Sequence, residues 1–539
     1  MIKFNKFVNK YKFELLIFIA SMIFSTWLMF SSFSYENGFM QISTKAWSDF
    51  ASHIPLIRSF SLGDNFPPQY PLFLGPAIKY HFLFYAFVGF LEKCGLRIDY
   101  ALNIPSILGF SFLILMIYVF SKNLFKSKAV GLLSITFFLF NSSLDFINFF
   151  IKYPLSFNTL QNILTNKAFL SFGPYDNKII SAFWNLNIYT NQRHLALSYG
   201  LSLFLILLIL KIYKNKSFAI SIFVGIILGL SFLLNTAVFL ITIIIFTGLF
   251  FFFKEQRVNI FVSIVIGCII ALPQYLYIQT LPSLFRPEIH LGYLINDLSP
   301  ISFVNYWWQN LGFNIILIPV AFFISDTKTK KIFLSFFSLF IIGNIIQFSP
   351  EIAANHKFFN FFVIAGNMFS AFLIVSCWRK KFYFKIISIL LIIFIIISGV
   401  INFFPIYNDT KIPLADYSVN KDIAWIIENT SPNANFLNSV YLYDNASIAG
   451  RKIFLGWPYF AWSQGYDTLS RDNLRKSLFN TNNLLFFCAN IAKYNLSYIE
   501  LNMHSPDVGI NVNFFNKYFK KVYENYQNGY IIYDLNKCK

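Results

Sequence analysis

Long apolar stretches that contain almost no charged residue recur between residues 13 and 404 of this 539-residue chain. A helix of about 20 apolar residues is long enough to cross the hydrocarbon core of a bilayer. Charged residues make up only 12% of the sequence, whereas a soluble chain carries about a quarter. The sequence therefore predicts a mainly α-helical, polytopic membrane protein rather than a soluble domain with one anchor.

The apolar stretches predict about eleven membrane spans. The expected spans lie at 13–33, 101–120, 128–146, 196–213, 217–235, 237–253, 258–277, 311–325, 331–348, 358–377 and 383–404. The segment 80–92 is also apolar, but the charges of Glu92 and Lys93 end it too early for a span. We expect this segment to form a helix that lies along the membrane surface.

Lysine and arginine collect in the short loops between alternate spans, as expected of loops that face the cytoplasm. This pattern predicts a cytoplasmic N-terminus and three long outside loops, at 34–100, 147–195 and 278–310. The formal net charge of +19 then reflects an orientation signal rather than a nucleic-acid partner.

The composition becomes ordinary after Pro405, and short β-rich runs alternate with amphipathic helices. We expect a transmembrane domain at 1–404 and a small extracytoplasmic α/β domain at 405–539. The stretch NASIAGRKIFLGWPYFAWSQGYDT contains Arg451 and many aromatic residues, which favour either a carbohydrate-stacking surface or core and membrane-interface packing. A disulfide between Cys488 and Cys538 is one alternative for the two cysteines of this domain.

Polar residues in the outside loops supply the candidate site. Asp49 and His53 follow the first span at a spacing of four residues, so a helix would place both on one face. An acid flanked by Trp47 and Phe50 is more costly to keep there than Ser or Asn would be. The other candidates are Tyr80, His81, Arg193, His194, Arg286, Glu288, His290, Glu351, His356 and Lys357.

Each of these clusters has a simpler interpretation as a solvated polar loop. Arg193 and Lys357 at the outer membrane boundary would suit interfacial side chains that reach toward water, but also a phosphate clamp. A phosphate-binding P-loop, a serine nucleophile elbow and an HExxH zinc motif are all absent from the sequence.

With these features the chain resembles the C-type (GT-C) superfamily of membrane glycosyltransferases. The resemblance covers the first span, the outside loop with an acid near its start, the many later spans and the outside C-terminal domain. The stretches FPPQYPLFLGPAIKYHFLFYAFVGFLEKCGL and AGRKIFLGWPYFAWSQGYDT are similar to segments of poorly characterised prokaryotic members.

The resemblance implies a prokaryotic cell-membrane enzyme that takes a sugar from a polyprenyl-phosphate carrier, with Asp49 in the position of the catalytic acid. The paired-acid motif of protein mannosyltransferases is absent because Phe50 follows Asp49. This departure leaves the acceptor open, and with it any dependence on a divalent metal.

The resulting hypothesis is a glycosyltransferase that inverts the anomeric carbon, with Asp49 as general base and His53 orienting it or contacting the donor phosphate. Charge on the departing lipid phosphate would be stabilised by cations and polar groups of the later loops, namely Arg193, His194, Arg286 and Lys357. The alternatives are a lipid or polysaccharide exporter and a membrane scaffold without catalytic activity.

Overall fold

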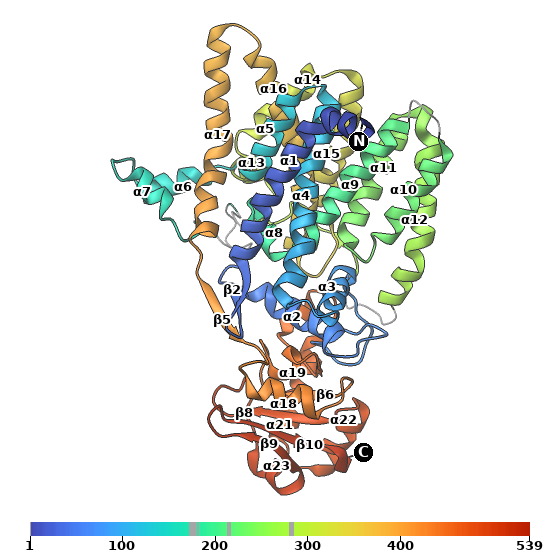
Figure 1. The fold of residues 1–539 in the computed structure, drawn as a ribbon, viewed down its shortest axis with the longest axis vertical. Coiled ribbons are helices and arrows are strands. Elements are labelled where there is room, and N and C mark those ends of the chain that lie inside the picture. Colours follow the sequence, from blue (N-terminus) through green and yellow to red (C-terminus); the bar gives the residue numbers. More distant parts are fainter. Residues whose placement is uncertain (1, 172–178, 180–182, 213–216, 280–284, 539) are drawn as a thin grey trace.

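A computed structural model describes the chain except for residues 1, 172–178, 180–182, 213–216, 280–284 and 539. It contains a helical bundle and, at the end away from the N-terminus, a smaller domain with a β-sheet (Figure 1). Six helices within the described residues are long and apolar enough to cross a bilayer. They are α1 (Ile2–Ser32), α4 (Ile98–Phe125), α9 (Arg193–Ile212), α12 (Arg257–Ile278), α16 (His356–Trp378) and α17 (Phe382–Tyr407).

Each remaining predicted span also coincides with a helix, but with a shorter one. These helices are α5 (Lys128–Leu139), α10 (Phe218–Leu230), α11 (Thr236–Phe252), α14 (Asn314–Ile324) and α15 (Thr327–Gly343). α14 forms a pair with α13 (Pro300–Leu311) that is bent by 88° and would count as a seventh span. The membrane-spanning character is therefore supported by the fold, whereas the count of about eleven stays a prediction.

Asn235 marks the break between α10 and α11. Its side chain accepts a hydrogen bond from the backbone N–H of Val238 at 3.2 Å and so caps the start of α11. Asparagine is a favoured N-cap because its side-chain oxygen satisfies a backbone donor that the first helical turn leaves free. The nearly continuous apolar sequence from 217 to 253 is thereby divided into two helices joined by a turn.

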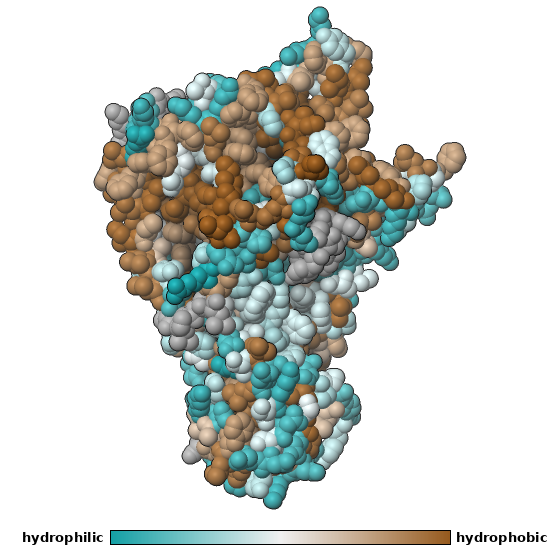
Figure 2. Space-filling view, turned by 180° about the vertical axis from the view of Figure 1, so that it is seen from behind, coloured by the Kyte–Doolittle hydropathy of each residue, from teal (hydrophilic) through white to brown (hydrophobic). Residues whose placement is uncertain are grey.

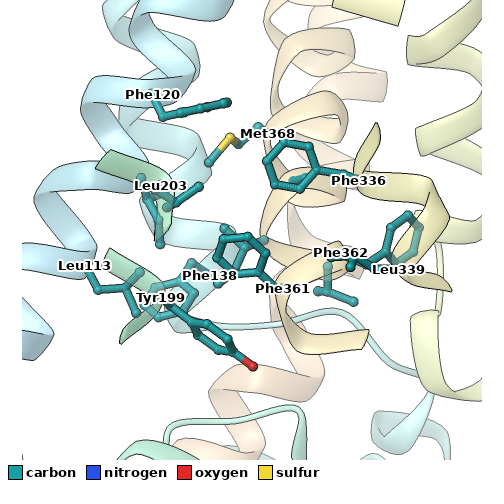
Figure 3. Close-up of a cluster of buried hydrophobic side chains, with 14 of the residues drawn as sticks. Leu113, Phe120, Phe138, Tyr199, Leu203, Phe336, Leu339, Phe361, Phe362 and Met368 are labelled. Atoms are coloured by element: carbon teal, nitrogen blue, oxygen red, sulfur yellow. The ribbon is translucent and has the colours of Figure 1, made fainter. Parts of the chain in front are cut away.

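Aromatic and aliphatic side chains fill the centre of the bundle. Figure 3 shows Leu113 of α4, Tyr199 of α9, Phe336 of α15 and Phe361 of α16 in one buried cluster. Glycine allows α4 and α9 to approach closely, because a Cβ atom at Gly200 would lie 3.2 Å from the backbone of Leu113. Figure 2 shows the outer face of the bundle as a broad hydrophobic band.

The segments predicted to lie outside fold against the end of the bundle. The hairpin β1 (Phe33–Glu36) and β2 (Phe39–Ser43) leads into α2 (Trp47–Ser61), and α3 (Leu83–Lys93) follows. The predicted surface helix 80–92 thus exists as α3, with Phe87 and Phe90 exposed. β2 also pairs with β5 (Lys411–Ala415), which directly follows α17.

Shorter elements complete the outside loops. α6 (Asp145–Lys152), α7 (Thr159–Leu164) and α8 (Asn187–Asn191) lie between α5 and α9. β3 (Glu288–Ile289) pairs with β4 (Ile346–Gln347) and brings the loop before α13 next to the loop before α16.

The C-terminal domain is built on a five-stranded mixed sheet in the order β7-β6-β8-β10-β9. Its elements are α18 (Lys421–Asn429), β6 (Asn435–Asn438), α19 (Asn445–Ile448), β7 (Lys452–Ile453), α20 (Pro458–Trp462), α21 (Thr468–Asn480), α22 (Leu484–Lys493), β8 (Tyr498–Asn502), α23 (Val512–Tyr518), β9 (Lys520–Asn525) and β10 (Tyr530–Asp534). Cys488 and Cys538 form a disulfide. Trp457 and Trp462 are exposed, whereas Tyr466 is buried.

A buried arginine connects α2 to the elements around it. Arg58, whose side chain is 1% exposed, forms ion pairs with Asp416 at 2.7 Å and with Glu92 of α3 at 3.2 Å. Asp416 directly follows β5, so one guanidinium joins α2 and α3 to the connection that leads into the C-terminal domain.

We predict that Arg58→Met lowers stability by about 3–5 kcal/mol, because it leaves two buried carboxylates without their counter-charge. The apparent melting temperature of the purified protein in detergent measures this loss. Lys476→Met is the matched control, since it breaks an exposed ion pair with Asp472 and should change the melting temperature little. An unchanged melting temperature for Arg58→Met would show that the two acids are not charged in the folded protein.

Candidate active site

A cavity of about 1230 Å³ lies where the bundle meets the outside elements. Its walls come from α2, α8, the turn between α10 and α11, the end of α12, the loop 348–357 and α20. Polar residues such as Asp49 and apolar residues such as Phe232, Phe239, Leu240 and Ile278 both line it. A cavity with a lining of both kinds suits an amphipathic ligand that has a polar head and an apolar chain.

Asp49 lines the cavity from the first turn of α2. The side chain of Asn191 hydrogen-bonds its carboxyl group, and Lys357 is the cation that interacts with it most strongly. Burial outweighs both of these effects and raises the pKa of Asp49 from 3.8 to about 6. At neutral pH the group is a carboxylate that accepts protons more readily than an ordinary aspartate.

Contacts to later parts of the chain fix the start of α2. The Tyr443 ring packs on Trp47 with centroids 4.3 Å apart, and its hydroxyl donates to the Trp47 carbonyl at 2.5 Å. Just before the helix, Lys45 pairs with Asp409 at 2.8 Å, and the Thr44 hydroxyl also donates to this carboxylate. The backbone at the start of α2 is thus held in place from both the C-terminal domain and the segment before β5.

His53 follows Asp49 by one helical turn and also lines the cavity. Its ring stacks on Tyr85 with centroids 4.6 Å apart, and its Nδ1 has no hydrogen-bond partner among the described residues. Burial lowers the pKa of His53 to about 3, so the imidazole is neutral at physiological pH. His53 therefore adds an uncharged polar group to the cavity wall.

His81 and His194 form a direct pair behind the cavity wall. Their Nε2 atoms are 2.8 Å apart, and the Tyr85 hydroxyl lies 3.0 Å from Nδ1 of His194. His81 lines the cavity and His194 does not. The structure therefore connects His194 to the site only through His81 and Tyr85.

Arg193 is likewise absent from the cavity lining. Its guanidinium donates to the Met29 carbonyl at 3.3 Å and to the Ser32 hydroxyl at 2.8 Å, both on α1. It also donates to Asn103 of α4 at 3.1 Å. These bonds join α9 to α1 and α4, so Arg193 holds the bundle together. Of the four residues predicted to bind the donor phosphate, Arg286 and Lys357 line the cavity.

Some of the remaining candidates line the cavity and others do not. Tyr80, Glu351 and His356 line the cavity, and Glu351 accepts a hydrogen bond from the Tyr459 hydroxyl at 3.1 Å. Three others lie elsewhere. Glu288 is exposed on β3, His290 bonds the Tyr293 carbonyl at 2.8 Å, and Arg451 donates to the Leu62 carbonyl at 2.9 Å behind the end of α2.

Sequence reasoning missed Asn191 and Tyr443. Asn191 belongs to the same YTNQRH stretch as Arg193, but α8 ends at Asn191 and α9 begins at Arg193. The break between the two helices turns Asn191 to the cavity and Arg193 into the bundle. No local signal marks Tyr443, because its role depends on a contact with Trp47 that spans most of the chain.

The cavity does not supply an obvious metal site. Among the described residues no group of three or more His, Cys, Asp or Glu side chains is placed to hold a metal ion. Lys357 is the charged neighbour of Asp49, and Glu351 accepts bonds from Tyr459 and from the Ala353 backbone.

No protein-family model and no curated protein matches the sequence. Among solved structures, the chain is similar to the Archaeoglobus fulgidus oligosaccharyltransferase tethered with an acceptor peptide that contains the NVT sequon. The identity is 12% and the TM-score 0.50, over 92% of this chain and 70% of that one. A second structure of the archaeal enzyme, in complex with an inhibitory peptide and a dolichol-phosphate, also gives 12% identity and a TM-score of 0.50, over 92% and 69%.

This similarity shows the fold. Over 92% of its length the chain shares the fold of these two archaeal structures.

The raised pKa of Asp49 predicts a pH-dependent gain of stability in Asp49→Asn. When the pKa of an acid is higher in the folded protein than in the unfolded chain, the protein loses stability as the pH rises through the interval between the two values. Here that interval runs from about 4 to about 6. We expect Asp49→Asn to be more stable than the wild type by about 3 kcal/mol at pH 7, with the gain shrinking toward pH 4.

Melting temperatures across this pH range measure the effect. Asp64→Asn is the control, because Asp64 is exposed and an asparagine retains an acceptor for its partner Asn433. Equal stability of Asp49→Asn and wild type at every pH would contradict the raised pKa.

Proposed function

We propose that the protein is a membrane glycosyltransferase that moves a sugar from a polyprenyl-phosphate-linked donor to an acceptor hydroxyl, with Asp49 as general base. The observation that carries this proposal is the position of the Asp49 carboxyl. Asp49 and Lys357 line the same cavity, which polar and apolar residues both line, and burial raises the pKa of Asp49 to about 6. The GT-C fold supports the enzyme class.

The reaction follows from this placement. The acceptor hydroxyl attacks the anomeric carbon while its proton passes to Asp49, and the bond from that carbon to the phosphate oxygen breaks on the opposite face. The products are the glycosylated acceptor, with inverted configuration, and the polyprenyl phosphate. A base with a pKa near 6 is deprotonated at neutral pH and still takes a proton well, which is the balance that general-base catalysis requires.

Lys357 and Arg286 supply positive charge for the donor phosphate, since both line the cavity with Asp49. The neutral His53 is available to hydrogen-bond the phosphate or the sugar. The apolar residues Phe232, Phe239 and Ile278 provide a surface for the first isoprene units. One of the similar archaeal structures contains a dolichol-phosphate, which is a lipid of this chemistry.

The active site is proposed to face the non-cytoplasmic side of a prokaryotic cell membrane. The distribution of Lys and Arg in the short loops supports this orientation. The Cys488–Cys538 disulfide supports it as well, because disulfides persist in oxidising compartments. Both features support an orientation with the C-terminal domain and the cavity outside and the N-terminus in the cytoplasm.

An exporter would need a polar path through the bundle. A polar cavity inside the bundle, lined by Ser198, Ser202, Ser231, Asn235 and Thr242, has a volume of about 10 Å³. This is room for about one water molecule. This polar cavity is therefore too small to carry a sugar or a lipid headgroup through the bundle.

We predict that Asp49→Asn lowers the turnover of a synthetic polyprenyl-phosphate sugar by about 10²–10⁴-fold, the usual contribution of a positioned general base. Release of polyprenyl phosphate by purified protein in the presence of a panel of acceptors measures it. Glu351→Gln is the matched control, because Glu351 is the other acid of the cavity and is already bonded to Tyr459. Full turnover in Asp49→Asn would exclude Asp49 as the base.

The pH dependence of turnover should report the same group. With Asp49 as base, the rate rises as the pH increases through about 6 and then levels off. Lys357 lowers the Asp49 pKa, so Lys357→Met should move this limb to higher pH as well as weaken donor binding. If the rate of Lys357→Met rises at the same pH as that of the wild type, a group other than Asp49 controls the rise.

A further inference from the structure

Two short helices, α6 and α7, form an arm that projects from the bundle. Figure 1 shows them extending sideways from α17, away from the other helices. We refer to residues 145–165 as the arm. Its large apolar side chains are exposed, with Ile151 at 74% and Leu160 at 67%. The full exposed set is Ile147, Ile151, Leu155, Phe157, Leu160 and Leu164.

The exposed residues of the arm are segregated. On α6, Ile147 and Ile151 are four residues apart and form one row, and the adjacent row is Asn148 and Lys152. α7 repeats the pattern, with Leu160 and Leu164 next to Gln161 and Thr165. Figure 2 shows the consequence, because the arm has a mainly hydrophobic edge toward the apolar band of the bundle and a mainly hydrophilic opposite edge.

Hydrogen bonds hold the base of the arm at the outer end of α17. The Asn402 side chain donates to Asp145 at 2.9 Å, and the Asn408 side chain donates to the Leu164 and Asn166 carbonyls at 2.7 and 3.0 Å. α17 is a candidate span that ends at Tyr407. The arm therefore leaves the bundle at the level where a spanning helix reaches the membrane boundary.

We propose that the arm lies in the lipid–water boundary of the leaflet nearest the C-terminal domain. Its apolar rows would contact the upper part of the acyl chains, and its polar rows the headgroups and water. A lipid surface fits the observations better than a protein partner does, because the apolar edge of the arm continues the apolar band of the bundle. This inference does not depend on the proposed enzymatic activity.

The placement has a structural consequence for the cavity. Asn408, which bonds the arm, is followed by Asp409, which holds Thr44 and Lys45. Thr44 and Lys45 line the cavity just before Asp49. A short chain of bonds therefore links the depth of the arm in the membrane to the position of the cavity wall.

Depth-dependent fluorescence quenching tests the proposal. Cys94, Cys268 and Cys377 are free and are first replaced by serine, while the disulfide is kept. Single cysteines are then introduced into the rows of the arm, labelled with an environment-sensitive dye and reconstituted into vesicles of phosphatidylcholine and phosphatidylglycerol. The apolar set is Ile147, Ile151, Leu160 and Leu164, and the matched polar set is Asn148, Lys152, Gln161 and Thr165.

We expect dyes in the apolar set to be quenched by lipids that carry a nitroxide near the top of the acyl chain. Dyes in the polar set should be quenched instead by iodide present on both sides of the vesicle. Strong iodide quenching of both sets would overturn the proposal by placing the arm in water. Protection of the apolar set from both quenchers, with energy transfer between differently labelled copies, would replace the lipid by a second copy of the chain.

Discussion

The ion pairs of Arg58 hold together the elements on which the candidate site depends. One guanidinium joins α2 to α3 through Glu92 and to the connection after β5 through Asp416. α2 carries both Asp49 and His53, so its rigid placement fixes two groups of the cavity at once. Burying three charges is costly, and such a cluster is stable only as a complete set. The ion pairs therefore fix the positions of α2, α3 and the connection after β5 relative to one another.

Burial also shifts the pKa values of Asp49 and His53, which lie on the face of α2 opposite Arg58. The surroundings that raise the Asp49 pKa also keep His53 neutral, so one helix presents a proton acceptor and an uncharged hydrogen-bonding group to the same cavity. Lys357 limits the shift at Asp49 and leaves the carboxylate charged at neutral pH. The site therefore combines a stronger base with a nearby cation, an arrangement that suits the transfer of a group from a phosphate.

Sequence patterns predicted the features that depend on local composition. The apolar stretches, the surface helix and the mixed C-terminal domain all follow from periodicity and hydropathy, and each corresponds to observed elements. Asp49 and His53 were predicted from their helical spacing, and both line the cavity. The pattern does not distinguish Lys357, which faces the cavity, from Arg193, which faces the bundle, because both lie at the start of an apolar helix. Only the break before α9 decides the direction of Arg193.

The pairing of β2 with β5 has a consequence for how the protein is made. Residues 39–43 find their partner at 411–415, and Asp409 secures the segment just before Asp49. The ribosome must therefore complete most of the polypeptide before the start of α2 can be secured. During this time the nascent chain already contains Asp49 but not the contacts that fix the helix around it. The cavity wall at α2 thus forms late in synthesis, when the segment after α17 has been made.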